Sequence, residues 1–204
     1  IDVTWTQNAG RLDVVVQLDY HEPAAALARR ELSLKLFGGN ETLYTIPLTE
    51  PGEALKIPGT DASVRLTLHN PQNAPLSGSE KVGFCTLEFT GLPRDVQYRV
   101  ALEGKGYQSL TSGPLSLDEY APRVYISAKS GGFALGDVTG DRVIDGQDLN
   151  RVAGALGKTP ADADVNQDGK TDITDLALVH HNMGQRRAEE VYAGALAVSG
   201  ILDA

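Results

Sequence analysis

The sequence predicts a multidomain fold: an N-terminal all-β sandwich of immunoglobulin-like type, followed by a small all-α region of two loop–helix repeats. Residues 1–127 alternate apolar and polar side chains with a period of two, between turns rich in Gly, Pro and Asn. From residue 136 the apolar spacing becomes helical, and the chain repeats itself at an offset of 27 residues, as from Asp137 to Asp164.

Strand periodicity is clearest in four segments, 11–20, 31–37, 63–68 and 96–102, where apolar residues occupy every second position. One apolar face per strand is typical of half-buried antiparallel sheets, and about seven such strands at short spacing predict the sandwich. The chain also opens on a strand-like segment, 1–7, without a visible signal peptide, which suggests a mature or excised fragment.

The single cysteine, Cys85, shares its alternation phase with Leu87 and Phe89. This phase predicts a buried strand cysteine. A single cysteine also excludes an internal disulfide framework.

The formal net charge of −9 argues against nucleic acid or an anionic membrane as a partner. No stretch of about 18 apolar residues is present, so no membrane span is predicted. The acid is concentrated in residues 136–184, which hold nine Asp against four basic residues. This excess predicts solvated surface, a cation site, or both.

Each repeat consists of an acidic loop, loop 1 (137–148) or loop 2 (164–175), and a helix of about three turns. The apolar side chains after the loops fall at i, i+3 and i+7 on one helical face: Leu149, Val152 and Leu156, then Leu176, Val179 and Met183. Gly157 and Gly184 follow as C-terminal stops. Since the segments before the loops hold at most one helical turn, each unit is predicted to be half of an EF-hand.

The loops offer oxygen ligands at the six positions that a calcium loop requires, with a backbone carbonyl at position 7. The predicted ligands are Asp137, Thr139, Asp141, Val143, Asp145 and Asp148 in loop 1, and Asp164, Asn166, Asp168, Lys170, Asp172 and Asp175 in loop 2. Because all of these are hard oxygens, without Cys or His, the sequence predicts two Ca²⁺ ions. The alternative is a polar turn that caps a helix, with Asp148 and Asp175 at the N-cap positions.

Arg142 stands at position 6 of loop 1, where loop 2 has Gly169. Position 6 makes a sharp turn that glycine adopts freely, and another residue there costs roughly 1 kcal/mol. The hydroxyl of Thr139 is also a poorer ligand than the amide oxygen of Asn166. We therefore expect loop 1 to bind calcium more weakly than loop 2.

The two tandem half EF-hands, with Asp at position 12, resemble the dockerin module over about fifty residues, from Gly136 to Gln185. The resemblance is strongest in the segment "ADVNQDGKTDITDLALVHHNMG". Thr139, Arg142 and Thr171 depart from the family pattern. The resemblance implies calcium-folded binding to a cohesin, which anchors a parent protein in an extracellular, cellulosome-like or cell-surface bacterial assembly for polysaccharide degradation. A sandwich directly before it resembles an X-module that braces the dockerin; residues 87–117 resemble the last strands of fibronectin-III-like or transthyretin-like modules.

The family carries partner specificity at loop positions 10 and 11 and helix positions 17, 18 and 22. The resemblance implies these partner-binding residues: Gly146, Gln147, Ala153, Gly154 and Lys158 in copy 1, and Ile173, Thr174, His180, His181 and Gln185 in copy 2. The two sets share nothing, so we expect a single binding orientation. His180 and His181 point about 100° apart on a helix, which disfavours zinc and leaves solvent exposure or partner contact.

These features divide the chain into a sandwich (1–127), a linker (128–135), a dockerin (136–185) and a tail (186–204) with a possible short amphipathic helix. No nucleophile elbow, HExxH motif or phosphate loop is present, so we do not expect an enzyme. The alternative function is a calcium-stabilised adhesin or stalk fragment of a secreted protein with no cohesin partner. A calcium sensor is disfavoured because the entering helices are missing.

Overall fold

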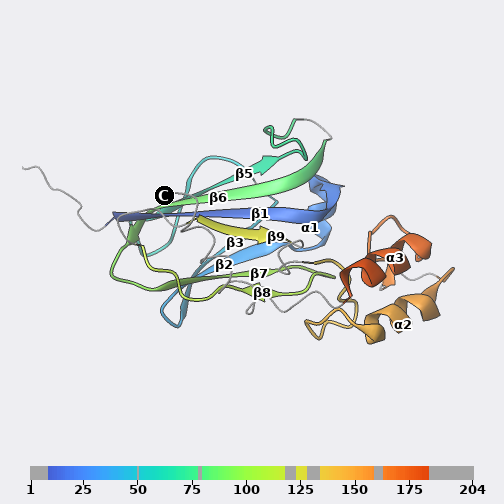
Figure 1. Cartoon of the computed structure of the whole chain (residues 1–204). Helices are drawn as coiled ribbons and strands as arrows, with labels where there is room; N and C mark the ends of the chain where they lie inside the picture. The colour runs from blue at the N-terminus through green and yellow to red at the C-terminus, as the bar shows by residue number, and fades with distance from the viewer. Residues whose placement is uncertain are drawn as a thin grey trace, which may run out of the picture.

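A computed structural model describes residues 9–49, 51–77, 80–117, 123–127, 134–158 and 163–183. Two β-sheets pack face to face, and two helices lie beyond one end of them (Figure 1). The first six elements are β1 (Ala9–Pro23), α1 (Ala24–Arg29), β2 (Ser33–Gly38), β3 (Glu41–Pro47), β4 (Leu55–Lys56) and β5 (Ser63–His69). The others are β6 (Lys81–Pro93), β7 (Tyr98–Glu103), β8 (Leu110–Thr111), β9 (Arg123–Ser127), α2 (Gly146–Ala155) and α3 (Ile173–Asn182).

The larger sheet has the strand order β4-β5-β6-β1-β9 and the smaller the order β3-β2-β7-β8. Neighbouring strands are antiparallel except β1 and β9, which run parallel. The long central pair β1 and β6 shifts register between Gln17 and Glu22. Such an irregularity bends a strand, and here it lies at the end of the sandwich that faces the helices.

The core lies between the two sheets and is formed by the alternating residues that the sequence predicts. Leu12, Val14 and Val16 are fully buried, as is Cys85 in β6. Burial raises the pKa of the Cys85 thiol to about 12, which keeps it an inert packing group. The Tyr98 hydroxyl donates to the Pro93 carbonyl at 2.8 Å, a corner contact typical of immunoglobulin-like sandwiches. The predicted fold class is therefore confirmed.

Helix α1 is a six-residue departure from the β pattern that the sequence analysis did not predict. Pro23 precedes it with φ −59°, and an alanine-rich run follows, which favours helix over strand. The helix covers one end of the sandwich, the end at which α2 and α3 lie (Figure 1).

Helices α2 and α3 lie side by side, and their buried side chains belong to the same hydrophobic cluster as the sandwich core (Figure 1). Val152 and Val179, the middle residues of the predicted apolar faces, are fully buried. The third residue of each predicted face is exposed instead, Leu156 at 39% and Met183 at 40%. Both are C-cap residues, where the chain has left the helix, so the i+7 position no longer points to the core.

The helical region is joined to the sandwich by backbone contacts. Leu135 is fully buried and forms an isolated β-bridge with Tyr107, and the amide of Gly136 donates to the Gly106 carbonyl at 2.8 Å. Residues 1–8 and the predicted tail lie outside the described residues, as do 128–133 of the predicted linker. Within the described part of the chain, no helix is long and apolar enough to cross a membrane.

Candidate functional site

The two acidic loops are built around the carboxylate of their first residue. In loop 1, Asp137 accepts from the amide of Gly140 at 2.7 Å and from the amide of Arg142 at 2.9 Å. In loop 2, Asp164 accepts from the amide of Gly169 at 2.8 Å. The chain therefore wraps back over this carboxylate in both copies, as a calcium loop does around its ion.

The carboxylate at position 12 closes each loop from the other side. Asp148 and Asp175 are fully buried. Asp148 accepts from the amides of Val138 and Thr139, both at 2.9 Å, whereas Asp175 accepts from the amide of Asn166 at 3.0 Å. Each position-12 side chain thus bonds the start of its own loop, which brings positions 1 to 3 and 12 together.

The helix caps differ from those the sequence analysis suggested. The N-cap residues are Asp145 and Asp172, at position 9, and Asp148 and Asp175 stand at N3. The amide of Asp172 donates to the Asp175 carboxylate at 2.8 Å, and Asp172 accepts from the amide of Thr174 at 2.7 Å, which is a reciprocal capping box. The same arrangement occurs in copy 1. A carboxylate in the first turn is also favoured by the helix dipole.

The electrostatics of the loops favour a bound cation. Burial raises the pKa of Asp137, and the nearby carboxylates of Asp148 and Asp141 raise it further. Burial likewise raises the pKa of Asp175, with a further contribution from Asp164. Both carboxylates are therefore held where their ionised forms are disfavoured, and a divalent cation would offset that cost.

The remaining predicted ligands line the same loops. The Thr139 hydroxyl lies 3.0 Å from an oxygen of Asp148 and 3.4 Å from one of Asp137, so it stands between the two carboxylates. The Asp141 carboxylate accepts from the amide of Val143 at 2.9 Å, a turn that fixes the position-7 carbonyl. In loop 2, the corresponding turn joins Asp168 and Lys170 at 3.0 Å, and Asn166 donates to Asp168 at 3.2 Å.

Within the described residues, no three His, Cys, Asp or Glu side chains converge closely enough to form a cation site by themselves. A calcium loop does not require this, since its ligand set includes a hydroxyl or amide at position 3 and a carbonyl at position 7. The two loops fit that mixed, all-oxygen set.

Each loop contains two residues with left-handed backbone, at positions 4 and 6. In loop 1 these are Gly140 (φ 79°) and Arg142 (φ 72°), and in loop 2 they are Gln167 (φ 57°) and Gly169 (φ 95°). Both loops thus carry one glycine and one strained residue, in opposite order. The left-handed backbone of Gln167 was not predicted from the sequence, although Gln167 aligns with Gly140 at the repeat offset of 27 residues. The strain at Arg142 therefore does not distinguish loop 1 from loop 2.

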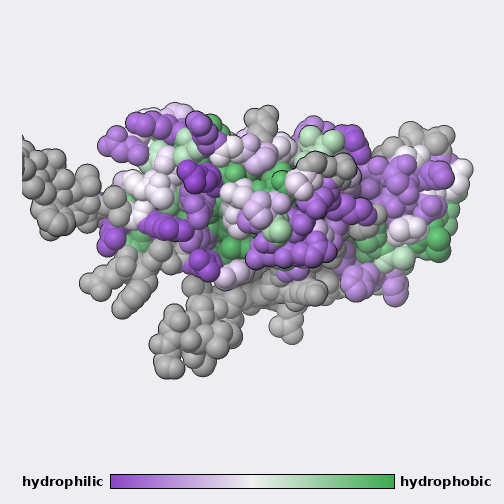
Figure 2. Space-filling model, turned by 90° about the horizontal axis from the view of Figure 1, so that it is seen from above, coloured by the Kyte–Doolittle hydropathy of each residue, from purple (hydrophilic) through white to green (hydrophobic). Residues whose placement is uncertain are grey.

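The partner residues that the resemblance implies are solvent-exposed wherever they are described, and Gln185 lies outside the described residues. Ile173 is 69% exposed at the first position of α3, the largest exposure among the exposed large hydrophobic side chains of the described residues. Lys158 donates to the Gly154 carbonyl at 2.6 Å and so folds over the end of α2. Figure 2 shows hydrophobic surface along the outer edge of the helical end, next to hydrophilic surface.

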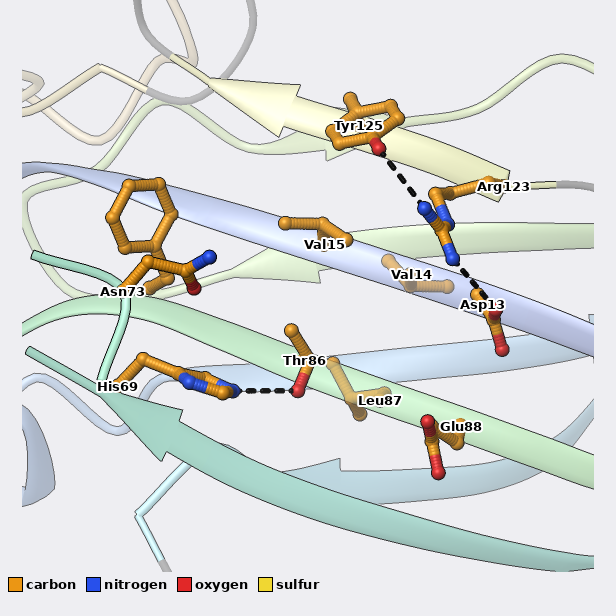
Figure 3. Close-up of a pocket in the computed structure, with 11 residues that line it drawn as sticks. Asp13, Val14, Val15, His69, Asn73, Thr86, Leu87, Glu88, Arg123 and Tyr125 are labelled. Carbon is orange, nitrogen blue, oxygen red and sulfur yellow. Dashed lines mark hydrogen bonds and ion pairs between the residues drawn. The ribbon is translucent and has the colours of Figure 1, made fainter. Parts of the chain in front are cut away.

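A separate hollow of about 440 Å³ lies on the outer face of the larger sheet, over β1, β6 and β9 (Figure 3). Asp13 and Glu88 face each other across β1 and β6, a spacing that could suggest paired catalytic carboxylates. Arg11 bonds both, at 2.8 Å to Asp13 and 3.2 Å to Glu88, and Arg123 lies 3.6 Å from Asp13. The two acids are thus paired with arginines, as on a salt-bridged sheet surface.

Residues 135–184 match the family model of the Dockerin type I domain, which confirms the predicted resemblance over that region. A search of curated proteins finds no match. One similar solved structure is an N-terminal interface mutant of the type II cohesin–X-dockerin complex from Acetivibrio cellulolyticus, at 14% identity and a TM-score of 0.46, covering 87% of this chain and 97% of that chain. A C-terminal interface mutant of the same complex is similar at 14% identity and a TM-score of 0.45, covering 86% of this chain and 96% of that chain.

Proposed function

We propose that this chain is a calcium-dependent protein–protein interaction module that binds a cohesin. Through it, the parent protein would be anchored in an extracellular cellulosome-like or cell-surface complex. The observation that carries the proposal is the pair of acidic loops with the same hydrogen-bonded frame, each feeding a capped helix, within residues that match the Dockerin type I domain.

Two calcium ions would be held by the loop residues at positions 1, 3, 5, 7, 9 and 12. When bound, calcium supplies the positive charge that offsets the buried carboxylates. The chain's own residues do the positioning: Asp148 and Asp175 tie the start of each loop to the first turn of the helix that follows. The loops and helices would therefore order together, and calcium would stabilise the surface that meets the partner.

The partner surface is proposed to consist of the exposed residues of α2 and α3 and their N-termini. Copy 2 offers Ile173, His180 and His181, and copy 1 offers a flat face with Gly154. A large apolar side chain that is 69% exposed is well placed as an anchor for a partner pocket. Since the two copies present different side chains, one orientation of the partner is expected to be favoured.

The sandwich is proposed to support the helices rather than to act on a substrate. We place the modules at 1–127, 136–185 and 186–204, with 128–135 joining the first two. The end of that junction is docked on the sandwich, since the amide of Gln108 donates to the Ala134 carbonyl at 2.9 Å. The sandwich would thereby limit the freedom of the helical region and pre-organise it for its partner.

A pull-down with a panel of cohesins, in calcium and in chelator, tests this proposal. We expect retention by at least one cohesin in calcium and release in chelator. Ile173→Ala should weaken retention, whereas Arg99→Ala, at a half-buried position on the sandwich, should not. Retention by no cohesin, together with a calcium-dependent melting temperature, would favour the adhesin or stalk fragment instead.

A further inference from the structure

A buried ion pair lies at the end of the sandwich next to the helices. Arg30, which follows α1 directly, is 1% exposed, and Glu22 at the end of β1 is 2% exposed. The Arg30 guanidinium donates to both oxygens of Glu22, with Nη2 to Oε1 at 2.7 Å, and it lies 5.4 Å from the centre of the Tyr107 ring. Because buried charges persist only when they are paired and hydrogen-bonded, this pair holds the guanidinium in one place.

The same guanidinium reaches across to loop 2. Arg30 Nη2 donates to the Val165 carbonyl at 2.9 Å, over a separation of 135 residues. Val165 is position 2 of the loop, between the proposed ligands Asp164 and Asn166. The sandwich therefore contacts loop 2 through a charged, buried donor that directly follows α1.

The contact fixes one particular peptide group. The carbonyl of Val165 accepts from Arg30, while the amide of Asn166 in the same peptide donates to Asp175 at 3.0 Å. The peptide plane is thus held at both ends, by the sandwich on one side and by the position-12 carboxylate on the other. Its orientation sets the direction in which the side chain of the proposed ligand Asn166 leaves the backbone.

Loop 1 is docked by backbone groups. The amides of Gly136 and Asp137 donate to the Gly106 carbonyl at 2.8 and 3.1 Å. These contacts are made by main-chain atoms alone, although Gly106 has a φ of 76° and lies beside the Arg30 guanidinium. The two loops consequently differ in how a substitution in the sandwich can affect them.

We propose that Arg30, held by Glu22, is a positioning residue for loop 2: it pre-orients the Val165–Asn166 peptide and so raises the calcium affinity of that loop selectively. This inference rests on the proposed calcium binding. Residues that orient ligands without touching the metal typically change metal affinity about 10- to 100-fold when they are removed. The folded sandwich is thereby linked thermodynamically to one of the two proposed ions.

The test uses the full chain with Arg30→Met and Glu22→Leu combined, which removes the donor without leaving a buried charge unpaired. Arg30→Lys is the second variant, since it keeps a charge for Glu22 but lacks the fork that also reaches Val165. Arg99→Met is the matched control, because Arg99 lies 5.7 Å from the Phe37 ring and likewise stacks on an aromatic. Calcium affinity is measured by calorimetry in the backgrounds Asp137→Ala and Asp164→Ala, which leave loop 2 and loop 1 respectively.

We expect both Arg30 variants to weaken calcium binding by loop 2 about 10-fold. The calcium affinity of loop 1 should change by less than about threefold in these variants. Arg99→Met should leave the calcium affinity of both loops unchanged. Equal losses of calcium affinity in the two loops, or an unchanged calcium affinity of loop 2, would overturn the inference.

Hydrogen exchange of the metal-free protein gives a readout that does not depend on calcium. The amide of Asn166 should exchange about 10-fold faster in both Arg30 variants, whereas the amide of Thr139, its counterpart in loop 1, should not change. If titration of the unmodified chain showed no calcium binding, the proposed function would fail. The exchange experiment would still test the positioning role of Arg30. Unaltered exchange at Asn166 contradicts the positioning role whatever the calcium titration shows.

Discussion

Replacing the strained non-glycine residue of each loop by glycine should stabilise the two loops to a similar extent. Arg142 and Gln167 have φ values of 72° and 57°. The left-handed conformation costs a non-glycine residue about 1–2 kcal/mol, and glycine loses about 0.5–1 kcal/mol through the freedom of its unfolded state. The net gain is therefore about 0.5–1 kcal/mol for Arg142→Gly and for Gln167→Gly alike.

The expected gain can be measured by thermal unfolding. For a chain of 204 residues it corresponds to a rise of about 1–4 °C in Tm. Gly140→Ala and Gly169→Ala are the matched controls in the opposite direction. A Cβ at either glycine meets no heavy atom within 4 Å, so these substitutions test conformation without steric overlap. Each should lower the unfolding free energy by about 0.5–1 kcal/mol.

A clear difference in the stability change between the two loops would contradict this expectation. A stabilising Arg142→Gly beside a neutral or destabilising Gln167→Gly would show that position 6 alone carries strain. A neutral Gly140→Ala would show that position 4 tolerates any side chain. In either case, the two loops would not carry equal backbone strain.

Three further predictions concern the loops and the helix faces. Asp148→Ala should lower the unfolding free energy of the metal-free protein by about 2–3 kcal/mol, because it leaves the half-buried amides of Val138, Thr139 and Asp145 without their acceptor. Denaturant unfolding measures this, and Gln147→Ala is the exposed control. Val179→Ala should lower the unfolding free energy by about 2 kcal/mol, because the Val179 side chain is fully buried. Ile173→Ala should change the unfolding free energy by less than about 0.5 kcal/mol and should weaken only partner binding, because Ile173 is exposed. The rise in Tm that calcium gives should shrink as the pH falls from 7 to about 4, because the raised pKa values of Asp137 and Asp175 let protons compete with the ion. In the metal-free protein, the stability that these two carboxyl groups contribute is present at low pH. It is lost as the pH rises through their raised pKa values. A calcium effect that is unchanged over this range would count against these carboxylates as ligands.

The strands and the two loop–helix units could be predicted from the sequence because burial leaves a periodic pattern along the chain. Leu12, Val14 and Val16 show this pattern, as do the acidic residues that recur at a spacing of 27, such as Asp137 and Asp164. Helix α1 could not be found in this way, since its six residues are too few to establish a helical period. An alanine-rich run after Pro23 was the available signal.

Other features depend on backbone angles or on contacts between distant residues, which leave no local pattern. The left-handed angle of Gln167 became apparent only in the structure, although its alignment with Gly140 in the other copy was an available signal. The contact of Arg30 with Val165 spans 135 residues, and no local pattern marks Glu22 and Arg30 as a buried pair. Leu156 and Met183 matched the helical spacing but lie at the C-caps, because each helix ends one residue earlier than the apolar pattern.

Calorimetric titration of the full chain with a cohesin, once in calcium and once in chelator, is the direct test of calcium-dependent cohesin binding. We expect one partner per chain in calcium, loss of binding in chelator, and recovery when calcium is restored. Binding of equal strength in chelator would contradict the calcium dependence. A complex that kept its full affinity when the exposed residues of either helix were substituted would contradict the single orientation.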